Sequence, residues 1–542
     1  MSQPETENRL NQTYPREGHR TLIWGVGLFL TLILLTSGAG IFLLSDKSLY
    51  LPLQLTNTLE LISIMHPELY NSGNLINSAQ SAVLNELDRY SGLLEPRELD
   101  RVHEEFTGSY GGIGISVVGH NYGLMIMTVR DDGPAGQIGI QTGDIIIKSD
   151  STELRGLSAY QSTFLLRGPE DSPLELTIVR NQMADTLKFN LIRRLLPLIH
   201  IPYAGITENN SLYIRISDFE MGVSRELRDV LDSLYLNNPD AIEQLIIDLR
   251  GNPGGLLREA HRTANMFLDA DHLIVGIRGR SIWREEKYYS TGSDITNNLP
   301  IALIVDRNSA SAAEILAGAL KYANRAILVG DTTFGKGLVQ EFSGLGDGSG
   351  LRLTTSRYYF EGEIFLNDPE AEVIDSASGI PPDYYFLFEG RKPFTNQLEN
   401  SSLLREFAIN NKKRIVQYAP FTDSDTDLMN EFNVYLQNNN FEFHSTIAGI
   451  AGLTKQLIAL QKFDDTYINA IDRICKIAQN DDKKQFDVNK NYIKRRLYQI
   501  ALESEFGTSR AYHDAILPYR EDIRFAESIL KSKIAENSDN EE

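Results

Sequence analysis

Apolar and polar positions follow different periods in different parts of the chain. From Thr21 to Leu44 the apolar residues are not interrupted by any charged residue. A helix of this length can cross the hydrocarbon core of a bilayer, which is about 30 Å thick. The pattern therefore predicts a transmembrane helix over residues 21–44.

The basic residues beside this segment predict its orientation. Arg9, Arg16 and Arg20 precede it, whereas Lys47 follows it. Because Lys and Arg are enriched on the cytoplasmic side of membrane helices, residues 1–20 should form a cytoplasmic tail. We expect a single-pass protein of the bacterial inner (cytoplasmic) membrane, with the rest of the chain in the periplasm or extracytoplasmic space.

A cleaved signal peptide is the alternative interpretation of the same segment. The small residues Ser37-Gly38-Ala39-Gly40 offer a cleavage site. The apolar run, however, is longer than the roughly 7–15 residues of a signal-peptide core and continues past these small residues. An uncleaved membrane anchor is therefore the favoured interpretation.

Helical and strand periods divide the remaining chain. Helical spacing predicts an N-terminal helical region over 50–107, where the apolar positions repeat once per turn. These positions include Leu55, Leu59, Ile62 and Met65. Strand and helix patterns alternate over 194–390, which is typical of an α/β fold. Helical spacing returns over 391–535 and predicts a C-terminal α-helical domain, while the polar, acidic residues 536–542 predict a disordered tail.

The apolar stripes of 391–535 have two interpretations. Such stripes more often form the core of a helical domain than a partner surface. The alternative is a surface that forms a homodimer or binds an adaptor protein.

Residues 108–193 combine alternating apolar positions with closely spaced glycines. The glycine-rich loop Gly111-Gly112-Ile113-Gly114-Ile115 is followed by Gly143-Asp144-Ile145-Ile146. This region is similar to a PDZ domain of the protease type. The resemblance implies that N–H groups of Gly111, Gly112, Ile113, Gly114 and Ile115 bind the terminal carboxylate of a peptide, which adds a strand to the sheet edge.

A serine at a predicted strand-to-helix junction is the first candidate for chemistry. Residues 301–306 have the pattern of a buried strand, and residues 312–323 have strong helix propensity, so Ser311 lies between them. Free N–H groups and the helix dipole stabilise negative charge at such a junction, and the N–H of Ala312 is the natural donor. The simpler interpretation is that Ser309 or Ser311 only caps the helix.

Lys336 is the candidate base for this serine. It lies between Gly335 and Gly337 in an uncharged stretch. Desolvation would lower the pKa of its ammonium group from about 10.4, so that the neutral amine takes a proton from a serine hydroxyl. An exposed loop lysine is the alternative. Gln340 would reach the same site if a turn or bulge at Gly337 shortened the chain.

Three segments together resemble the carboxyl-terminal processing (tail-specific) peptidases, over roughly residues 80 to 385. They are Asp248 to Gly255, Asn308 to Glu314 and Thr333 to Gln340. The resemblance implies a catalytic dyad of Ser311 and Lys336, with Gln340 orienting the lysine. It also implies that the N–H groups of Gly255 and Ala312 form an oxyanion hole. The implied fold is an α/β protease core of ClpP/crotonase type over 194–390, interrupted by an inserted PDZ domain.

Three further features qualify this interpretation. Asp248 and Arg250 would, on the simpler interpretation, be a buried pair that holds a turn. Arg167 lies where the family has an arginine and would couple peptide binding to the protease site, although a surface arginine is the alternative and the more common case. Residues 360–363, Phe-Glu-Gly-Glu, replace a Pro-Ser/Asn-Gly stretch of many family members, which puts only local substrate contacts in doubt.

Composition excludes several other classes of protein. Cys475 is the only cysteine, so the chain forms no intramolecular disulfide. The formal charge of −21 argues against nucleic-acid binding. Nine histidines occur without metal-ligand spacing, so we expect neither a metal nor another cofactor.

The sequence therefore predicts a membrane-anchored serine endopeptidase. Its PDZ domain would capture accessible C-terminal ends of exported proteins, and Ser311 would attack the peptide carbonyl for processing or degradation. The alternative is a catalytically silent PDZ scaffold. A second alternative, with Ser309 as the nucleophile, depends only on the register of the segment.

Overall fold

A computed structural model describes residues 47–541, with gaps at 69–70, 97, 100–101, 103–106, 158, 181–184, 237–238, 281–284, 347, 367–378, 389–391, 418–425 and 462–463. The predicted cytoplasmic tail and transmembrane helix over 1–44 lie outside the described residues. Among the described residues, no helix combines the length and apolar character that crossing a bilayer requires. The chain forms two compact units, Met1–Leu93 and Leu94–Glu542.

The first unit contains two helices within the predicted N-terminal helical region. They are α2 (Lys47–Met65) and α3 (Ser72–Asn85), and β1 (Gly92–Leu94) lies at the boundary of the unit. Asn71 caps α3, because its side-chain oxygen accepts hydrogen bonds from the N–H groups of Gly73 and Asn74 at 2.9 and 3.4 Å.

A mainly parallel sheet forms the centre of the second unit, in the order β10-β11-β12-β15-β16-β20. Only β10 runs antiparallel to its neighbour. Strands buried on both faces need near-continuous apolar sequence, and the inner strands have it. The bounds are β10 (Tyr203–Ile206), β11 (Ser211–Arg215), β12 (Gln244–Asp248), β15 (Ile301–Val305), β16 (Ala326–Gly330) and β20 (Tyr384–Tyr385).

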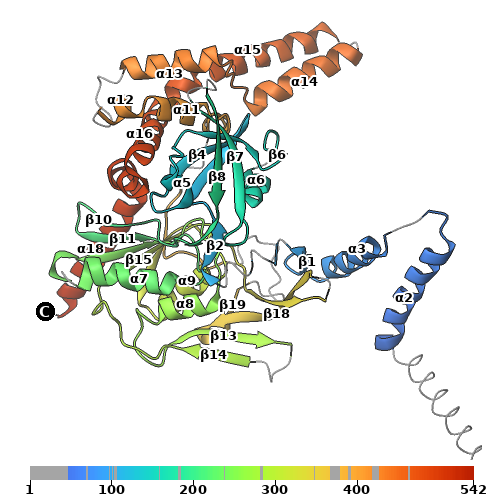
Figure 1. Cartoon of the computed structure of the whole chain (residues 1–542). Coiled ribbons are helices and arrows are strands. Elements are labelled where there is room, and N and C mark those ends of the chain that lie inside the picture. The colour runs from blue at the N-terminus through green and yellow to red at the C-terminus, as the bar shows by residue number, and fades with distance from the viewer. Residues whose placement is uncertain are drawn as a thin grey trace, which may run out of the picture. The chain divides into compact units, whose positions relative to one another are not determined.

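Helices cover both faces of this sheet (Figure 1). On β12, Leu245 and Ile247 pack on the side of α7 (Val223–Leu231), α8 (Leu257–Ala264) and α9 (Ala312–Tyr322). Ile246 faces the opposite side, where α18 (Glu521–Glu541) packs. The last helix of the predicted C-terminal helical domain therefore packs as a layer of the α/β core. The helix also continues to Glu541, into the segment for which a disordered tail was expected.

A second sheet is built around the long strand β18 (Gly350–Phe360). This strand pairs with β13, β17 and β19, and β13 pairs in turn with β14. Their bounds are β13 (Leu273–Gly279), β14 (Glu285–Tyr289), β17 (Leu338–Gly344) and β19 (Ile364–Phe365). Strand β17 carries Gln340, and the loop before it carries Lys336.

The region expected to be a PDZ domain forms its own sheet in the order β3-β4-β5-β7-β8, with β6 beside β5. The short strands β2 (Ser109–Gly112) and β9 (Arg194–Pro197) pair where the chain enters and leaves this region. Its other elements are β3 (Ile115–His120), β4 (Gly123–Val129), α5 (Pro134–Gln137), β5 (Ile145–Ser149), β6 (Thr152–Glu153), α6 (Ala159–Leu166), β7 (Pro173–Arg180) and β8 (Asp185–Ile192). The pairing of β2 with β9 makes this region an insertion in the longer chain.

The helices after residue 392 form a further core that includes part of the β4 strand. Met125 and Met127 of β4 pack with Phe407 and with helix α16. The helices that contribute buried side chains to this core are α10 (Pro393–Asn400), α11 (Leu403–Asn410), α12 (Lys412–Gln417), α13 (Thr426–Asn438) and α16 (Lys490–Phe506). The other helices of this region are α14 (Thr446–Gln461), α15 (Asp465–Val488) and α17 (Thr508–Ala511).

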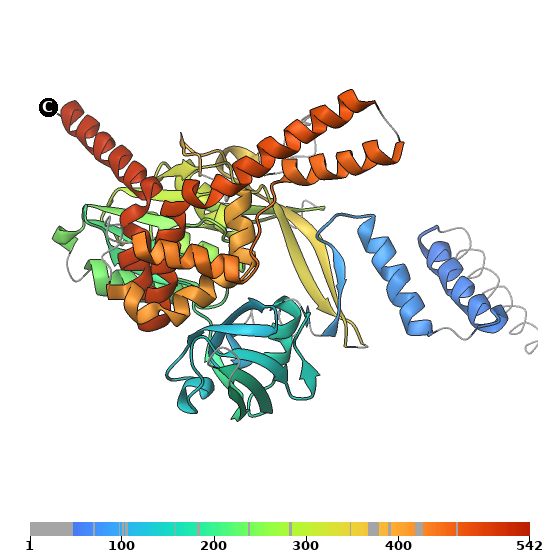
Figure 2. The ribbon, with the colours of Figure 1, turned by 90° about the horizontal axis from the view of Figure 1, so that it is seen from above.

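Helices α14 and α15 lie side by side as a hairpin (Figure 2). Large apolar side chains of α14 remain exposed, with between 58 and 79% of their surface accessible. They are Ile447, Ile450, Leu453, Leu457 and Leu460. The stripes expected to form a helical core therefore do so in α11, α13 and α16 but not on this face of the hairpin.

Candidate active site

Ser311 lies at the strand-to-helix junction that the sequence predicts. It follows β15 and occupies the N-cap position of α9, with φ 56° and ψ −117°. A non-glycine residue in this region of φ/ψ space costs on the order of 1–3 kcal/mol, and such strain concentrates at functional sites. An ordinary helix cap has extended backbone angles and carries no such cost. The strained backbone therefore favours a functional role over simple capping.

The turn after β12 approaches Ser311 closely. Gly254 has φ +100°, and a Cβ atom added there would lie 2.6 Å from the Ser311 Cβ. The next residue, Gly255, forms a bridge with Phe219. The hydrogen bonds of this bridge use the Gly254 carbonyl and the Leu256 N–H, so the Gly255 N–H lies outside the pairing. Only glycine permits this approach of backbone to nucleophile.

One cleft of about 660 Å³ contains the predicted site residues. Its lining includes Ser311, Lys336, Gln340, Gly255 and Ala312. The N–H of Ala312 is the first of α9, where no preceding helical carbonyl can accept it. Segments that are far apart in sequence thus place a hydroxyl, an amine, an amide and two N–H groups around one space.

The lysine segment has the irregular backbone that the sequence required. Gly335 has φ 87°, and the pairing of β17 with β18 shifts register between Val339 and Gln340. This bulge lies two residues after Gly337, where a turn or bulge was expected. Gln340 lines the cleft, and its Nε2 donates to Thr354 Oγ1 at 3.5 Å.

Glu314 connects the serine and lysine segments, and sequence reasoning did not identify it as a site residue. Its fully buried carboxylate accepts the Ser311 N–H at 2.8 Å and the Lys336 N–H at 2.9 Å through Oε2. Its Oε1 accepts the Gly335 N–H at 2.7 Å and the Thr333 hydroxyl at 2.6 Å. The position three residues after an N-cap was the available signal, because a glutamate there closes a capping box.

Desolvation and hydrogen bonding have opposite effects on Glu314. Burial raises the pKa of its carboxyl, while the hydrogen bonds from Thr333, Gly335, Ser311 and Lys336 favour the ionised form. Each donor is fixed in the backbone or in a buried side chain, so the carboxylate holds the two segments in a fixed relation.

Ser309 does not lie in the cleft. Its side chain is fully buried, and its hydroxyl donates to the Leu249 carbonyl at 2.9 Å and accepts the Asp306 N–H at 3.0 Å. Ser309 therefore joins the turn after β12 to the segment before α9. These contacts favour Ser311 over Ser309 as the nucleophile.

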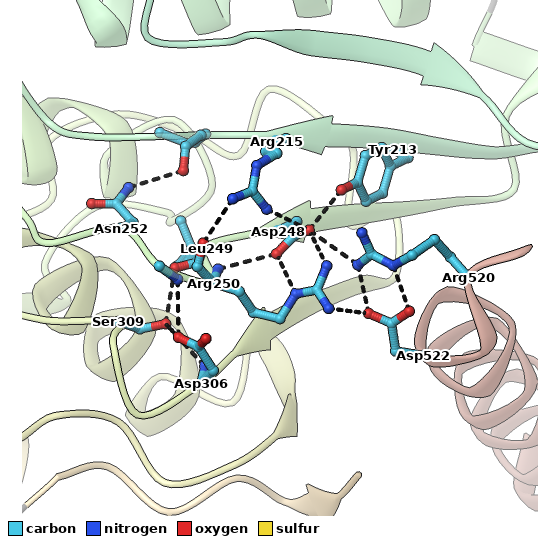
Figure 3. A network of polar contacts seen from close by, with 12 residues as sticks. Tyr213, Arg215, Asp248, Leu249, Arg250, Asn252, Asp306, Ser309, Arg520 and Asp522 are labelled. Carbon is cyan, nitrogen blue, oxygen red and sulfur yellow. Dashed lines mark hydrogen bonds and ion pairs between the residues drawn. The ribbon is translucent and has the colours of Figure 1, made fainter. Parts of the chain in front are cut away.

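Asp248 and Arg250 form the buried pair that was the simpler interpretation of their segment. The Arg250 Nη2 donates to Asp248 Oδ2 at 2.7 Å, and the Arg250 N–H donates to Asp248 Oδ1 at 3.0 Å (Figure 3). The two oxygens of one carboxylate thus fix both the side chain and the backbone at the start of the turn that leads to Gly255.

His200, Asp218 and Glu220 are the described residues whose ligand atoms lie close enough together to hold a metal, within 4.8 Å. The buried His200 Nδ1 bonds to Asp218 Oδ1 at 2.6 Å, so this ring nitrogen already has a protein partner. Burial opposes ionisation of Asp218, but its hydrogen bond to His200 holds the pKa of that carboxyl below its ordinary value. Asp218 and Glu220 both line the cleft.

The glycine-rich loop of the inserted domain lies between β2 and β3. Gly111 and Gly112 belong to β2, whereas Ile113 and Gly114 connect the strands and Ile115 begins β3. Strand β3 is at the edge of its sheet order. A peptide strand can add at such an edge.

Arg167 follows α6 and contacts the strand that leads into the inserted domain. Its guanidinium lies 4.6 Å from the ring centre of Tyr110 on β2. The following residue, Gly168, donates its N–H to the Gly111 carbonyl at 3.1 Å. The segment after α6 is therefore in direct contact with the connection between the inserted domain and the core.

Comparisons with known proteins identify two domains in the chain. The sequence model of peptidase family S41 matches residues 210–386, and that of the PDZ domain matches residues 111–191. The chain therefore carries a peptidase S41 domain and a PDZ domain. It is a serine protease that carries a PDZ domain, and the S41 region contains Gly255, Ser311, Lys336 and Gln340.

Individual relatives of this S41 protease bear consistent names. The carboxy-terminal-processing protease of Bartonella bacilliformis is 29% identical over 342 residues, which cover 63% of this chain and 78% of that protein. Carboxyl-terminal-processing peptidase 2 (chloroplastic) of Arabidopsis thaliana is 32% identical over 311 residues, covering 55% of this chain and 57% of the relative. The solved structure of a photosystem II D1 C-terminal processing protease is 24% identical with a TM-score of 0.36, covering 61% of this chain and 86% of that one.

Replacing Glu314 with Gln should lower kcat by about 10- to 100-fold, because displacing a catalytic group by about 1 Å costs up to about 100-fold. The amide cannot accept hydrogen bonds at both former oxygen positions, so one segment loses its contacts. Steady-state hydrolysis of an unfolded protein substrate measures the change. As a control, Glu341→Gln alters an exposed glutamate of β17 and should leave kcat within about twofold. Full activity of Glu314→Gln would contradict the role of this carboxylate.

Proposed function

We propose that this chain is a membrane-anchored endopeptidase that cleaves with a dyad of Ser311 and Lys336. The observation that supports the dyad most directly is the Glu314 carboxylate, which bonds the backbone N–H groups of both residues. One buried group thereby fixes the position of the nucleophile relative to its base. The substrates would be exported proteins with accessible C-terminal ends.

The cleft residues suggest how the reaction proceeds. Lys336 Nζ, oriented by Gln340, takes the hydroxyl proton as Ser311 Oγ attacks the peptide carbonyl carbon. The carbonyl oxygen becomes an oxyanion that accepts hydrogen bonds from the N–H groups of Gly255 and Ala312. When the intermediate collapses, the C–N bond breaks and Lys336 gives its proton to the leaving amine. Water then hydrolyses the acyl-enzyme ester by the same route and restores the serine.

A catalytically silent scaffold explains these features less well. A binding protein gains nothing from the strained backbone of Ser311 or from the buried Glu314 carboxylate and its several donors. Both features have a cost in free energy and both serve the arrangement of the dyad.

The inserted domain is proposed to bind the C-terminal end of the substrate. A peptide would extend along the edge strand β3, with its carboxylate at the N–H groups of the loop from Gly111 to Ile115. Arg167 would couple this binding to the protease site, since its contact with Tyr110 links the end of α6 to β2. Strand β2 is one of the two connections between the inserted domain and the protease core.

The membrane anchor, the orientation and the extracytoplasmic location of the catalytic part are proposed from residues 1–44. Their apolar run and flanking arginines support them. A core of ClpP/crotonase type is proposed from the family resemblance. The exposed stripe of α14 supports a contact with a second copy or an adaptor, which stays a prediction.

Ser311→Ala and Lys336→Ala should each lower the rate of cleavage of an unfolded protein by at least about 1,000-fold. The two residues act as one catalytic unit, so the loss of either one removes most of the rate enhancement. Ser309→Ala should retain cleavage, because the Ser309 hydroxyl of the unmodified protein joins two loops and does not face the cleft. Gel-based cleavage assays on the full-length chain in detergent measure all three. Undiminished cleavage by Ser311→Ala would rule out the dyad.

Amidating the terminal carboxylate of a substrate should raise KM about 10-fold or more with little change in kcat. The amide removes the charged acceptor that the loop N–H groups would bind, whereas the cleft is unchanged. Arg167→Ala should instead lower kcat on the intact substrate, because it acts after the end has bound. Equal KM values for intact and amidated substrates would exclude selection of C-terminal ends.

Removing residues 1–44 should release the protein from membranes. The full-length chain should resist extraction by alkaline carbonate, whereas the shortened chain should be recovered in the soluble fraction. Immunoblotting of the two fractions, with a known inner-membrane protein as control, measures the difference. Extraction of the full-length chain by carbonate would argue against a spanning helix.

A further inference from the structure

A buried network of charges lies where β12 ends and the turn to Gly255 begins (Figure 3). Asp248 Oδ2 accepts hydrogen bonds from Arg215 Nη1 at 3.0 Å, Arg250 Nη2 at 2.7 Å and Arg520 Nη2 at 3.2 Å. The Tyr213 hydroxyl donates to the same oxygen at 2.6 Å. One carboxylate thus faces three guanidinium groups, which are brought together from distant parts of the chain.

Asp522, at the start of α18, supplies a second carboxylate to this network. Its Oδ2 accepts the Arg250 Nη1 at 2.7 Å and the Arg520 Nη2 at 2.5 Å, and its Oδ1 accepts the Arg520 Nε at 2.7 Å. The side chain of Asp522 is only 5% exposed, and that of Arg250 is 16% exposed. Arg250 is therefore held from two sides, by Asp248 of its own turn and by Asp522 of the last helix.

The backbone after Arg250 is held by a continuous set of contacts. The Arg250 carbonyl accepts from Arg215 Nη2 at 3.0 Å, and the Gly251 N–H donates to Asp306 Oδ1 at 2.9 Å. The Asn252 side chain then accepts the Gly254 N–H at 2.9 Å and donates to the Ile216 carbonyl at 3.0 Å. Movement of Arg250 would therefore be transmitted through a short, rigid turn to Gly255.

Charge balance makes Asp522 important for this turn. Without its negative charge, Arg215, Arg250 and Arg520 would share the single carboxylate of Asp248 in a site shielded from water. Removing one partner of a buried ion pair leaves the remaining charges uncompensated, and the structure relaxes to solvate them. Arg250 belongs to the turn itself, so its displacement would move the turn.

We propose that Arg520 and Asp522 are positioning residues for the oxyanion hole. The last helix of the chain, on the face of the sheet opposite α9, fixes the turn that presents the Gly255 N–H to the reacting carbonyl. This inference rests on the proposed dyad and oxyanion hole. It assigns to the end of the chain a role in the chemical step as well as in packing.

The chain offers a matched control for simple docking of α18. Glu527 is also buried, and its carboxylate accepts hydrogen bonds from Thr207, Asn209 and Ser211 at 2.6 to 2.7 Å. Ser211 begins β11, whereas Arg215 ends it, so Glu527 docks the same helix at the opposite end of that strand. Loss of Glu527 contacts weakens docking without touching the turn.

The experiment compares Asp522→Asn with Glu527→Gln in the full-length chain in detergent. We expect Asp522→Asn to lower kcat by about 10- to 100-fold, the range for loss or displacement of an oxyanion donor, with KM within about twofold. Its affinity for a peptide boronic acid, which forms a tetrahedral adduct with the serine, should fall by the same factor. Glu527→Gln should lower the unfolding temperature but leave kcat and boronate affinity within about twofold.

Arg520→Lys is a second variant in case Asp522→Asn does not fold. It keeps the positive charge but loses the paired hydrogen bonds to Asp522, so an intermediate loss of kcat and boronate affinity is expected. Unchanged kcat in Asp522→Asn or Arg520→Lys, or an equal loss in Glu527→Gln, would overturn the positioning role. An inactive wild-type chain, or an active Ser311→Ala chain, would instead overturn the proposed function.

Discussion

The arrangement of the site depends on one buried carboxylate. Glu314 extends from the first turn of α9 and accepts hydrogen bonds from the segment before the helix and from the loop before β17. Neither segment is regular secondary structure, so neither has a ladder of hydrogen bonds to fix it. The carboxylate replaces that ladder, and its burial is tolerated because its hydrogen-bonding capacity is used by fixed donors.

The central parallel sheet provides the frame on which this carboxylate acts. Parallel strands must be covered on both faces, and the chain meets this need with elements from distant regions. Helices α7, α8 and α9 cover one face, while α18 covers the other. The last helix completes the core and, through Arg520 and Asp522, also contacts the turn that leads to the cleft.

The inserted PDZ domain is connected to this frame through the short strands β2 and β9. Their pairing brings the entry and exit of the domain together, so a contact on β2 is a contact with the connection itself. The stacking of Arg167 on Tyr110 occurs at this place. Met125 and Met127 of the same domain also pack into the helical core after residue 392, which gives the insertion a second attachment.

Local sequence patterns predicted the elements that carry the candidate site and the residues proposed for its chemistry. Local periodicity identified the strand before Ser311, the helix after it and the apolar strand that ends at Asp248, because these signals depend only on neighbouring residues. The glycines beside Lys336 and before Leu256 indicated irregular backbone, since only glycine adopts those conformations without cost. Motif order then indicated the family, which the S41 and PDZ matches confirmed.

The contacts that hold these residues in place are seen only in the folded chain. Glu314 belongs to a predicted helix, and only the fold shows that its carboxylate meets the lysine loop. The apolar stripe of α18 is compatible with a separate helical domain or with a layer of the core, because periodicity defines a buried face but not its partner. The network of Asp248, Arg250, Arg520 and Asp522 joins residues that are about 270 positions apart. Such contacts leave no local pattern in the sequence, so they become visible only when the sheet brings their elements together.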